Sequence, residues 1–146
     1  MVSGKELFKS LLKDAGQSIT TARMHVFDAL DSQEPLSMHE LVLRARGVDR
    51  ASVYRAVQLF ERLGIVQRLN TGWKYKIELT DKFAEHHHHL TCLQCGKTIA
   101  IGEAELEDVL AGIAACHRFK PSAHQIEIQG YCENCQPASL PAPGKI

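Results

Sequence analysis

Residues 49–79 read DRASVYRAVQLFERLGIVQRLNTGWKYKIEL, and their pattern predicts the architecture of the first half of the chain. Its first half predicts a helix, because apolar side chains recur every three or four positions along residues 53–63. Asp49 or Arg50 begins this helix. Gly64 ends it, since glycine readily adopts the left-handed conformation found just after helices.

A β-hairpin is expected directly after that helix. Residues 65–69 and 73–79 are two short extended pieces rich in residues that favour strands. Asn70-Thr71-Gly72 lies between them and is predicted to be the turn.

Three short helices are expected upstream. Apolar residues at helical spacing predict the first over residues 5–14. Thr20 or Thr21 caps the second, and Ser37 caps the third. Short helices followed by a β-hairpin form the winged-helix order, a helix-turn-helix variant, so residues 1–79 are predicted to be a winged-helix DNA-binding domain.

A second unit is expected after a short hinge at residues 80–85. The chain is therefore predicted to be α+β, with a small α/β domain over residues 86–136 and a flexible Pro/Ala-rich tail over residues 137–146. The small domain is expected to contain an extended segment over residues 86–93, a strand over 98–101, a helix over 103–117 and a last strand over 124–131. That last strand would place His124, Ile126 and Ile128 on one face.

The charge of the chain is divided between its two parts. Net charge is zero over all 146 residues, but residues 1–84 hold 13 Lys and Arg against 10 Asp and Glu, and residues 85–146 hold 4 against 7. A basic front and an acidic rear fit a nucleic-acid-binding end joined to a metal-binding end.

The sequence also predicts a cytosolic protein. No apolar run approaches the roughly 18 residues of a membrane span, and the first residues do not form a signal peptide. Five cysteines in a reducing compartment favour metal binding over disulfides.

Two C-x2-C pairs, Cys92 to Cys95 and Cys132 to Cys135, are separated by 36 residues. Each pair can turn both sulfurs toward one ion, and two pairs complete the closed tetrahedral site of a structural zinc. The alternative is two unrelated redox or incidental pairs. Cys116 is left over and is interpreted as a small core residue of the predicted helix.

Four consecutive histidines, His86 to His89, precede the first cysteine pair. In an extended segment, alternate side chains point to opposite faces, so this run can serve two different metal sites. Glu107 and His124 could join the first and third histidines, and Glu78 could join the second and fourth. The alternative is a solvated polar run, although His-rich tracts favour metal binding.

These features together resemble the ferric uptake regulator family, whose members sense metals, peroxide or haem. The resemblance covers residues 5–135. It implies a winged-helix reader, a dimerisation domain and a two-fold symmetric repressor. The segments that carry it are Thr21-Ala22-Arg23, Ala51-Ser52-Val53-Tyr54-Arg55, Leu63-Gly64-Ile65-Val66, His86-His87-His88-His89-Leu90, Cys92-Leu93-Gln94-Cys95-Gly96-Lys97 and the last cysteine pair.

The resemblance assigns the metal ligands to three sites. It places structural zinc on Cys92, Cys95, Cys132 and Cys135, a second metal on His86, His88, Glu107 and His124, and a regulatory metal at the hinge on Glu78, His87 and His89.

This chain departs from the family pattern at two positions near the hinge site. It has Glu34-Pro35 near where iron-type members bring a histidine, and Ala100 where they bring a glutamate. The fourth hinge donor is therefore open, and the sequence offers Glu34, His39 and Glu103 as candidates.

The resemblance also places DNA contacts on the helix that follows Asp49. Base edges and phosphates would be reached from the N-terminal half of that helix, and further lysines could add phosphate contacts. The residues are Arg50, Ser52, Tyr54 and Arg55, with Arg23, and the lysines are Lys13, Lys74 and Lys76.

The expected function is a metal-dependent repressor of metal-homeostasis genes that binds palindromic double-stranded DNA as a homodimer and does not associate with membranes. A regulatory set of histidines with one glutamate favours zinc, beside the structural zinc. The alternatives are Fe2+ or Mn2+ sensing, a peroxide sensor that oxidises a histidine beside iron, and a metal-buffering protein without DNA binding. An enzyme is not expected, because the cysteine site is closed and no nucleophile accompanies the histidines.

Overall fold

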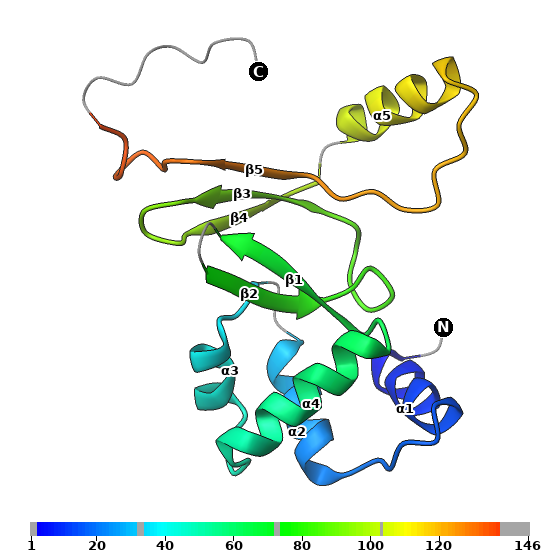
Figure 1. Ribbon diagram of the computed structural model, residues 1–146, viewed down its shortest axis with the longest axis vertical. Coiled ribbons are helices and arrows are strands. Elements are labelled where there is room, and N and C mark those ends of the chain that lie inside the picture. Colours follow the sequence, from blue (N-terminus) through cyan, green and yellow to red (C-terminus); the bar gives the residue numbers. More distant parts are fainter. Residues whose placement is uncertain (1–2, 32–33, 72–73, 103, 138–146) are drawn as a thin grey trace. The chain divides into compact units, whose positions relative to one another are not determined.

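The computed structural model describes residues 3–31, 34–71, 74–102 and 104–137 of the chain. The chain divides into two compact units, Met1–Glu85 and His86–Ile146, which are described separately. Figure 1 traces both units along the chain.

The first unit begins with four helices, each capped by a side chain that accepts a backbone hydrogen bond. The predicted cap Ser37 is confirmed, Thr20 rather than Thr21 caps the second helix, and Ser3 and Asp49 cap the first and fourth. The helices are α1 (Gly4–Asp14), α2 (Thr21–Leu30), α3 (Met38–Arg44) and α4 (Arg50–Arg62).

Aromatic packing holds these helices together. Phe8 of α1 stacks on Phe27 of α2, with ring centroids 4.2 Å apart, and meets Phe60 of α4 edge to face at 5.1 Å. Such pairs add to the free energy of burial because the ring edges and faces carry opposite partial charge. Leu12, Leu41 and Val53 are also fully buried in this core.

A two-stranded hairpin, β1 (Val66–Thr71) and β2 (Lys74–Leu79), follows α4 and is called the wing below. The predicted turn Asn70-Thr71-Gly72 is wrong for Asn70 and Thr71, which are ladder residues of β1 because cross-strand pairing overrides their turn preference. Gly72 lies outside the described residues. Leu36 forms an isolated antiparallel bridge with Ile77 of the wing. The helices and the wing confirm the winged-helix architecture.

Gly64 connects α4 to the wing with a positive φ of 64°, a conformation that glycine adopts without steric cost. The hydroxyl of Thr80 then donates to the Gly64 carbonyl at 2.9 Å. This bond closes the base of the wing against the end of α4.

The second unit is a three-stranded sheet with one helix. Strand β3 (His88–Cys92) lies in the middle, antiparallel to β4 (Thr98–Ile101) and parallel to β5 (Glu127–Gly130). Helix α5 (Ala104–Cys116) lies in the connection from β4 to β5. The parallel pair is β3 and β5, and the chain between two parallel strands needs a long crossover such as this one.

Three expectations for the second unit need correction. The last strand is shorter than predicted and starts at Glu127, so His124 precedes it in a loop, because only the residues after it pair with β3. The extended segment becomes a strand only from His88. Cys116 is exposed and is not a core residue, since none of the described side chains of α5 is buried.

Among the described residues, no helix is both long and apolar enough to cross a membrane. The tail predicted to be flexible lies, from residue 138 onward, outside the described residues.

The capping box of α3 gives a test of the first unit. Ser37 and Glu40 satisfy each other's backbone N–H groups, and hydrogen bonding from the Ser37 side chain lowers the pKa of Glu40. Ser37→Ala should lower the free energy of unfolding by about 1 kcal/mol, measured by urea titration with fluorescence of Trp73, the only tryptophan.

The same pair predicts a pH dependence. The pKa of Glu40 is lower in the folded state than in the unfolded state. Its contribution to the free energy of unfolding is therefore complete above the pKa of the unfolded state and is lost as the pH falls through the lower pKa of the folded state. The difference between wild type and Ser37→Ala should therefore shrink in acid. Ser18→Ala, an exposed serine outside the helices, should show neither effect; equal losses in both variants at all pH values would contradict the assignment.

Candidate metal centres

Strand β3 organises the metal-ligating residues of the second unit. Its side chains alternate between the two faces of the sheet, so His88 and His89 point in opposite directions. The two histidines before the strand continue this alternation. The ring centroid of His86 lies 4.8 Å from that of His88, and the ring centroid of His87 lies 4.7 Å from that of His89. The histidine run therefore supplies two pairs of imidazoles.

The four thiols predicted to bind zinc converge at the end of this strand. Their sulfur atoms all lie within 4.8 Å of one another, and those of Cys95 and Cys132 are 3.7 Å apart. Tetrahedral zinc with Zn–S bonds near 2.3 Å requires sulfurs about 3.8 Å apart, whereas a disulfide requires about 2.05 Å. All five cysteines are free, so the geometry fits an ion and not a crosslink.

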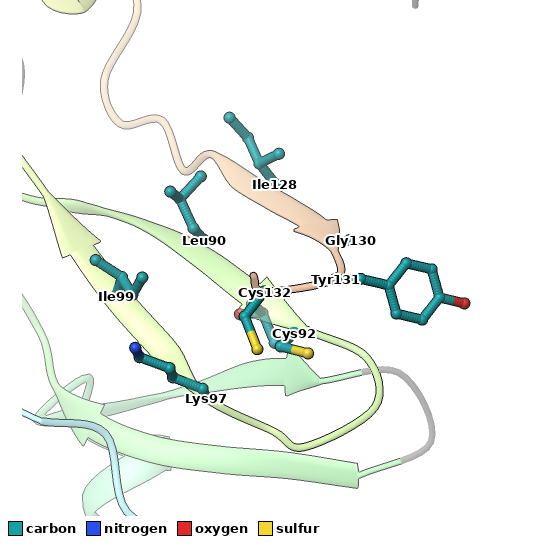
Figure 2. Close-up of a pocket in the computed structure, with 9 residues that line it drawn as sticks. Leu90, Cys92, Lys97, Ile99, Ile128, Gly130, Tyr131 and Cys132 are labelled. Carbon is teal, nitrogen blue, oxygen red and sulfur yellow. The ribbon is translucent and has the colours of Figure 1, made fainter. Parts of the chain in front are cut away.

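Pairing of β5 with β3 brings the two cysteine pairs together. Cys92 pairs with Gly130 at the end of the ladder, and the chain turns after β5 to present Cys132. Figure 2 shows the sulfurs of Cys92 and Cys132 side by side there, beyond an apolar row of Leu90, Ile99 and Ile128. Gly96, with a φ of 73°, allows the first pair to turn back tightly.

The thiols are electrostatically suited to a cation. Backbone hydrogen bonds from Cys95 and then Cys132 lower the pKa of Cys92 to about 6. The thiol of Cys132, followed by desolvation, raises the pKa of Cys135 to about 12. One thiolate forms easily, but four adjacent negative charges cannot coexist without a counterion. A divalent ion that prefers sulfur supplies that charge.

The second predicted set also converges within the second unit, on Nε2 nitrogens. His88 Nε2 lies 2.7 Å from Glu107 Oε1, and His124 Nε2 lies 3.1 Å from the same oxygen. His86 Nε2 is 3.0 Å from His124 Nε2. A tetrahedral ion with ligands near 2.0–2.1 Å requires separations of about 3.3 Å, so the four residues fit an ion with small adjustments.

Burial and charge support the same conclusion for this set. His88 is 1% exposed, and its Nδ1 has no hydrogen-bond partner among the described residues. Hydrogen bonding to His88, and then to His124, lowers the pKa of Glu107, so the carboxylate is ionised at neutral pH. A buried imidazole that faces a carboxylate and two further imidazoles is a suitable donor set for zinc or a similar ion.

The residues of the predicted hinge site belong to different units. Glu78 is buried on β2 in the first unit, where the Gln67 amide donates to its Oε1 at 2.7 Å. His87 and His89 form the second imidazole pair of the other unit. Gln67 is a functional candidate that no local sequence pattern reveals, because only strand register places it beside Glu78.

The structure describes two of the three predicted candidates for the fourth hinge donor. Glu34 is exposed, and His39 is exposed on α3. Glu103 lies outside the described residues. Ala100 pairs with His89 across β3 and β4, and its methyl side chain offers no donor atom.

The residues predicted to contact DNA lie on α4 and α2. The Arg50 guanidinium lies over the Tyr54 ring at 5.5 Å, and Arg55 donates to the Ser52 hydroxyl at 2.9 Å. Arg23 on α2 donates to the Ser18 carbonyl and to the Gln17 side chain. Arg50 and Arg55 are exposed near the start of α4, as a recognition helix requires.

Comparisons with known proteins agree with this architecture. A sequence model of the Ferric uptake regulator family matches residues 14–129. The ferric uptake regulation protein of Yersinia pestis is 35% identical over 136 residues, or 86% of this chain and 89% of that protein. The Vibrio cholerae ferric uptake regulator structure is 31% identical with a TM-score of 0.70, covering 83% of this chain and 96% of that chain. A zinc-bound manganese uptake regulator is 30% identical with a TM-score of 0.63, covering 84% and 96%.

The thiol cluster predicts a specific zinc dependence. Cys135→Ser should lower the zinc content by about one ion per chain and unfold the second unit, because that unit buries little apolar surface without the ion. Zinc would be measured by plasma mass spectrometry and folding by circular dichroism. Cys116→Ser, which removes an exposed thiol outside the cluster, should keep the zinc. Full zinc content in Cys135→Ser would rule out the four-thiol site.

Proposed function

Because this chain belongs to the ferric uptake regulator family, we propose that it is a repressor that binds palindromic operators as a dimer when its hinge site holds metal. The family consists of metal-responsive transcription regulators and not of enzymes. The observation that carries the proposal is that β3 begins with a histidine run forming two imidazole pairs and ends at a cluster of four thiols.

The proposal gives the four-thiol cluster a structural role. Zinc on Cys92, Cys95, Cys132 and Cys135 ties the turn after β3 to the turn after β5. Such a site is closed and leaves no position for substrate. Its contribution is therefore to the free energy of folding, and it should stay filled while the other sites exchange.

The second site would be formed by His86, His88, Glu107 and His124. These residues come from the start of β3, from α5 and from the loop before β5. An ion here would fix α5 and that loop against the sheet. The support is the set of donor separations of 2.7–3.5 Å around Glu107 Oε1 and His124 Nε2.

The switch is assigned to the hinge site, Glu78 with His87 and His89. When bound, the ion would link a carboxylate on the wing to imidazoles of the dimerisation domain. Gln67 holds the Glu78 carboxylate through one oxygen and so restricts its orientation. The linkage stabilises the DNA-binding arrangement only to the extent that the ion binds that arrangement more tightly than the others.

We assign zinc as the sensed metal because two of the hinge donors, His87 and His89, are imidazoles. Imidazole suits zinc and iron alike, and two imidazoles with one carboxylate also form a donor set for Fe2+, whereas manganese favours oxygen donors. Iron and manganese are the competing metals. The Yersinia pestis relative is named for ferric uptake and another similar protein is a manganese uptake regulator with zinc bound, so direct titration must decide between the three metals.

DNA reading is assigned to α4 of the winged-helix domain. Arg50 and Tyr54 stack, and Arg55 is held by Ser52, so these side chains are oriented before DNA arrives. Arginines at the start of a recognition helix reach phosphates and base edges, and Arg23 at the start of α2 would add a phosphate contact. The small net positive charge of this domain favours two copies binding together.

The apolar surface of the second unit supports the dimer. Ile99 and Ile128 flank Leu90 in one row of the sheet and are 43% and 47% exposed. Val109 and Ile113 on α5 are 58% and 55% exposed. Large exposed apolar side chains grouped on one small unit mark a protein interface, and a second copy of the chain is the occupant that the family suggests.

The hinge assignment predicts the effect of removing His89. His89→Ala should leave the fold and the structural zinc intact but abolish metal-dependent DNA binding. The measurement is fluorescence anisotropy with a palindromic duplex, using stripped protein titrated with zinc, ferrous iron or manganese. In the wild type, zinc should restore binding at the lowest free concentration.

The matched control is His117→Ala, which removes an exposed histidine just after α5 and should bind as the wild type does. Metal-dependent binding that persists in His89→Ala would exclude the hinge assignment. Restoration by ferrous iron or manganese, with zinc acting only in excess, would assign the protein to iron or manganese homeostasis.

The DNA assignment predicts the effect of removing Arg55. If Arg55 contacts a phosphate, Arg55→Ala should weaken binding by a similar factor for all duplexes and reduce the slope of log K against log salt by about 1. Arg62→Ala, at the far end of α4, should change neither quantity much. A loss confined to one duplex sequence would instead show that Arg55 reads a base.

A further inference from the structure

Glu127, the first residue of β5, has a buried carboxylate oxygen without a partner. Its Oε1 is inaccessible to solvent and makes no hydrogen bond among the described residues. A carboxylate removed from water is destabilised unless a cation or a donor compensates it. The position of this oxygen therefore calls for a positively charged or hydrogen-bonding neighbour.

The sheet register places Glu127 beside His89. The two residues are paired in the parallel ladder of β3 and β5, and paired residues on adjacent strands, about 4.8 Å apart, point their side chains to the same face. His89 is 1% exposed, and the ring of His87 lies 4.7 Å from its ring. Glu127 therefore lies on the same face of the unit as the two imidazoles, although its oxygens are not among the donor atoms that already converge there, so its side chain must rotate toward them to share an ion.

The rest of this face offers Glu127 no cation. On the other side of His89 in the same row stands Ala100, which has no donor atom. The next row on the same face consists of Thr98, Thr91 and Gln129, all uncharged. Neither row contains a lysine or an arginine that could neutralise the carboxylate.

We propose that Glu127 is the second carboxylate donor of the hinge metal and binds a divalent cation together with His87, His89 and Glu78. This inference rests on the proposed hinge site. It completes a four-donor set that the sequence left with three. Two carboxylates and two neutral imidazoles also balance the charge of a divalent ion, which favours burial of the filled site.

Two isosteric substitutions and one relocation test this inference. Glu127→Gln keeps the shape of the side chain and removes its charge, and Glu105→Gln removes the same charge from an exposed position of α5. In the double variant Ala100→Glu with Glu127→Gln, the carboxylate moves to the opposite neighbour of His89 in the same row. All variants are compared with the unsubstituted 146-residue chain, with the thiol site filled with zinc.

Two readouts report on the site independently of DNA binding. The first is zinc affinity of the hinge site, from competition with a chromophoric chelator. The second is the visible absorption of Co2+ bound there, which reports the number and type of ligands. Glu127→Gln should weaken zinc binding about tenfold or more and change the cobalt spectrum, Glu105→Gln should do neither, and the double variant should recover affinity.

The outcomes separate this inference from the proposed function. If His89→Ala loses the hinge ion while Glu127→Gln retains wild-type affinity and spectrum, the hinge site stands and the role of Glu127 is overturned. If weakened affinity comes with an unchanged cobalt spectrum and no recovery in the double variant, Glu127 is not a donor. If neither variant affects the ion, the hinge site itself is wrong. Retained structural zinc and an unchanged circular dichroism spectrum verify folding in each case.

Discussion

The pleat of β3 is the constraint on which the chemistry of this protein depends. A five-residue strand with neighbours on both sides must send alternate side chains to opposite faces. His88 therefore faces Glu107, and His89 lies on the opposite face, in the row that contains Glu127. The same strand ends in Cys92, so one element supplies residues to three candidate metal sites, and a shift of register by one residue would exchange the ligands of two of them.

The two units obtain their stability from different sources. The first has a core of aromatic and aliphatic side chains from four helices and the wing. In the described part of the second unit, Cys92 is the only apolar side chain classed as buried. A unit of that size and composition depends on metal ligation and on a partner to complete its folding. Metal and partner binding therefore contribute to its stability as well as to regulation.

This arrangement suits a sensor. The thiol cluster fits an ion with high affinity for sulfur, because four converging thiols otherwise resist full ionisation, as the raised pKa of Cys135 indicates. The second histidine set has two donors within reach of solvent, the His86 and His124 side chains, each 33% exposed, so exchange of its ion with solvent is possible. A regulator needs both properties: one ion that stays and at least one that reports concentration.

Local spacing and short motifs in the sequence predict the helices, the cap Ser37, the strand Thr98–Ile101, the family and the grouping of the cysteines. The sequence misplaced the wing turn and the start of β5, where hydrogen bonding to a neighbouring strand decides which residues pair. It could not identify Gln67 beside Glu78 or Glu127 beside His89, because neither pair is related by a local sequence period. Strand register brings each pair together, and register depends on contacts between segments that are distant in the sequence. These two pairs are therefore visible only in the tertiary structure.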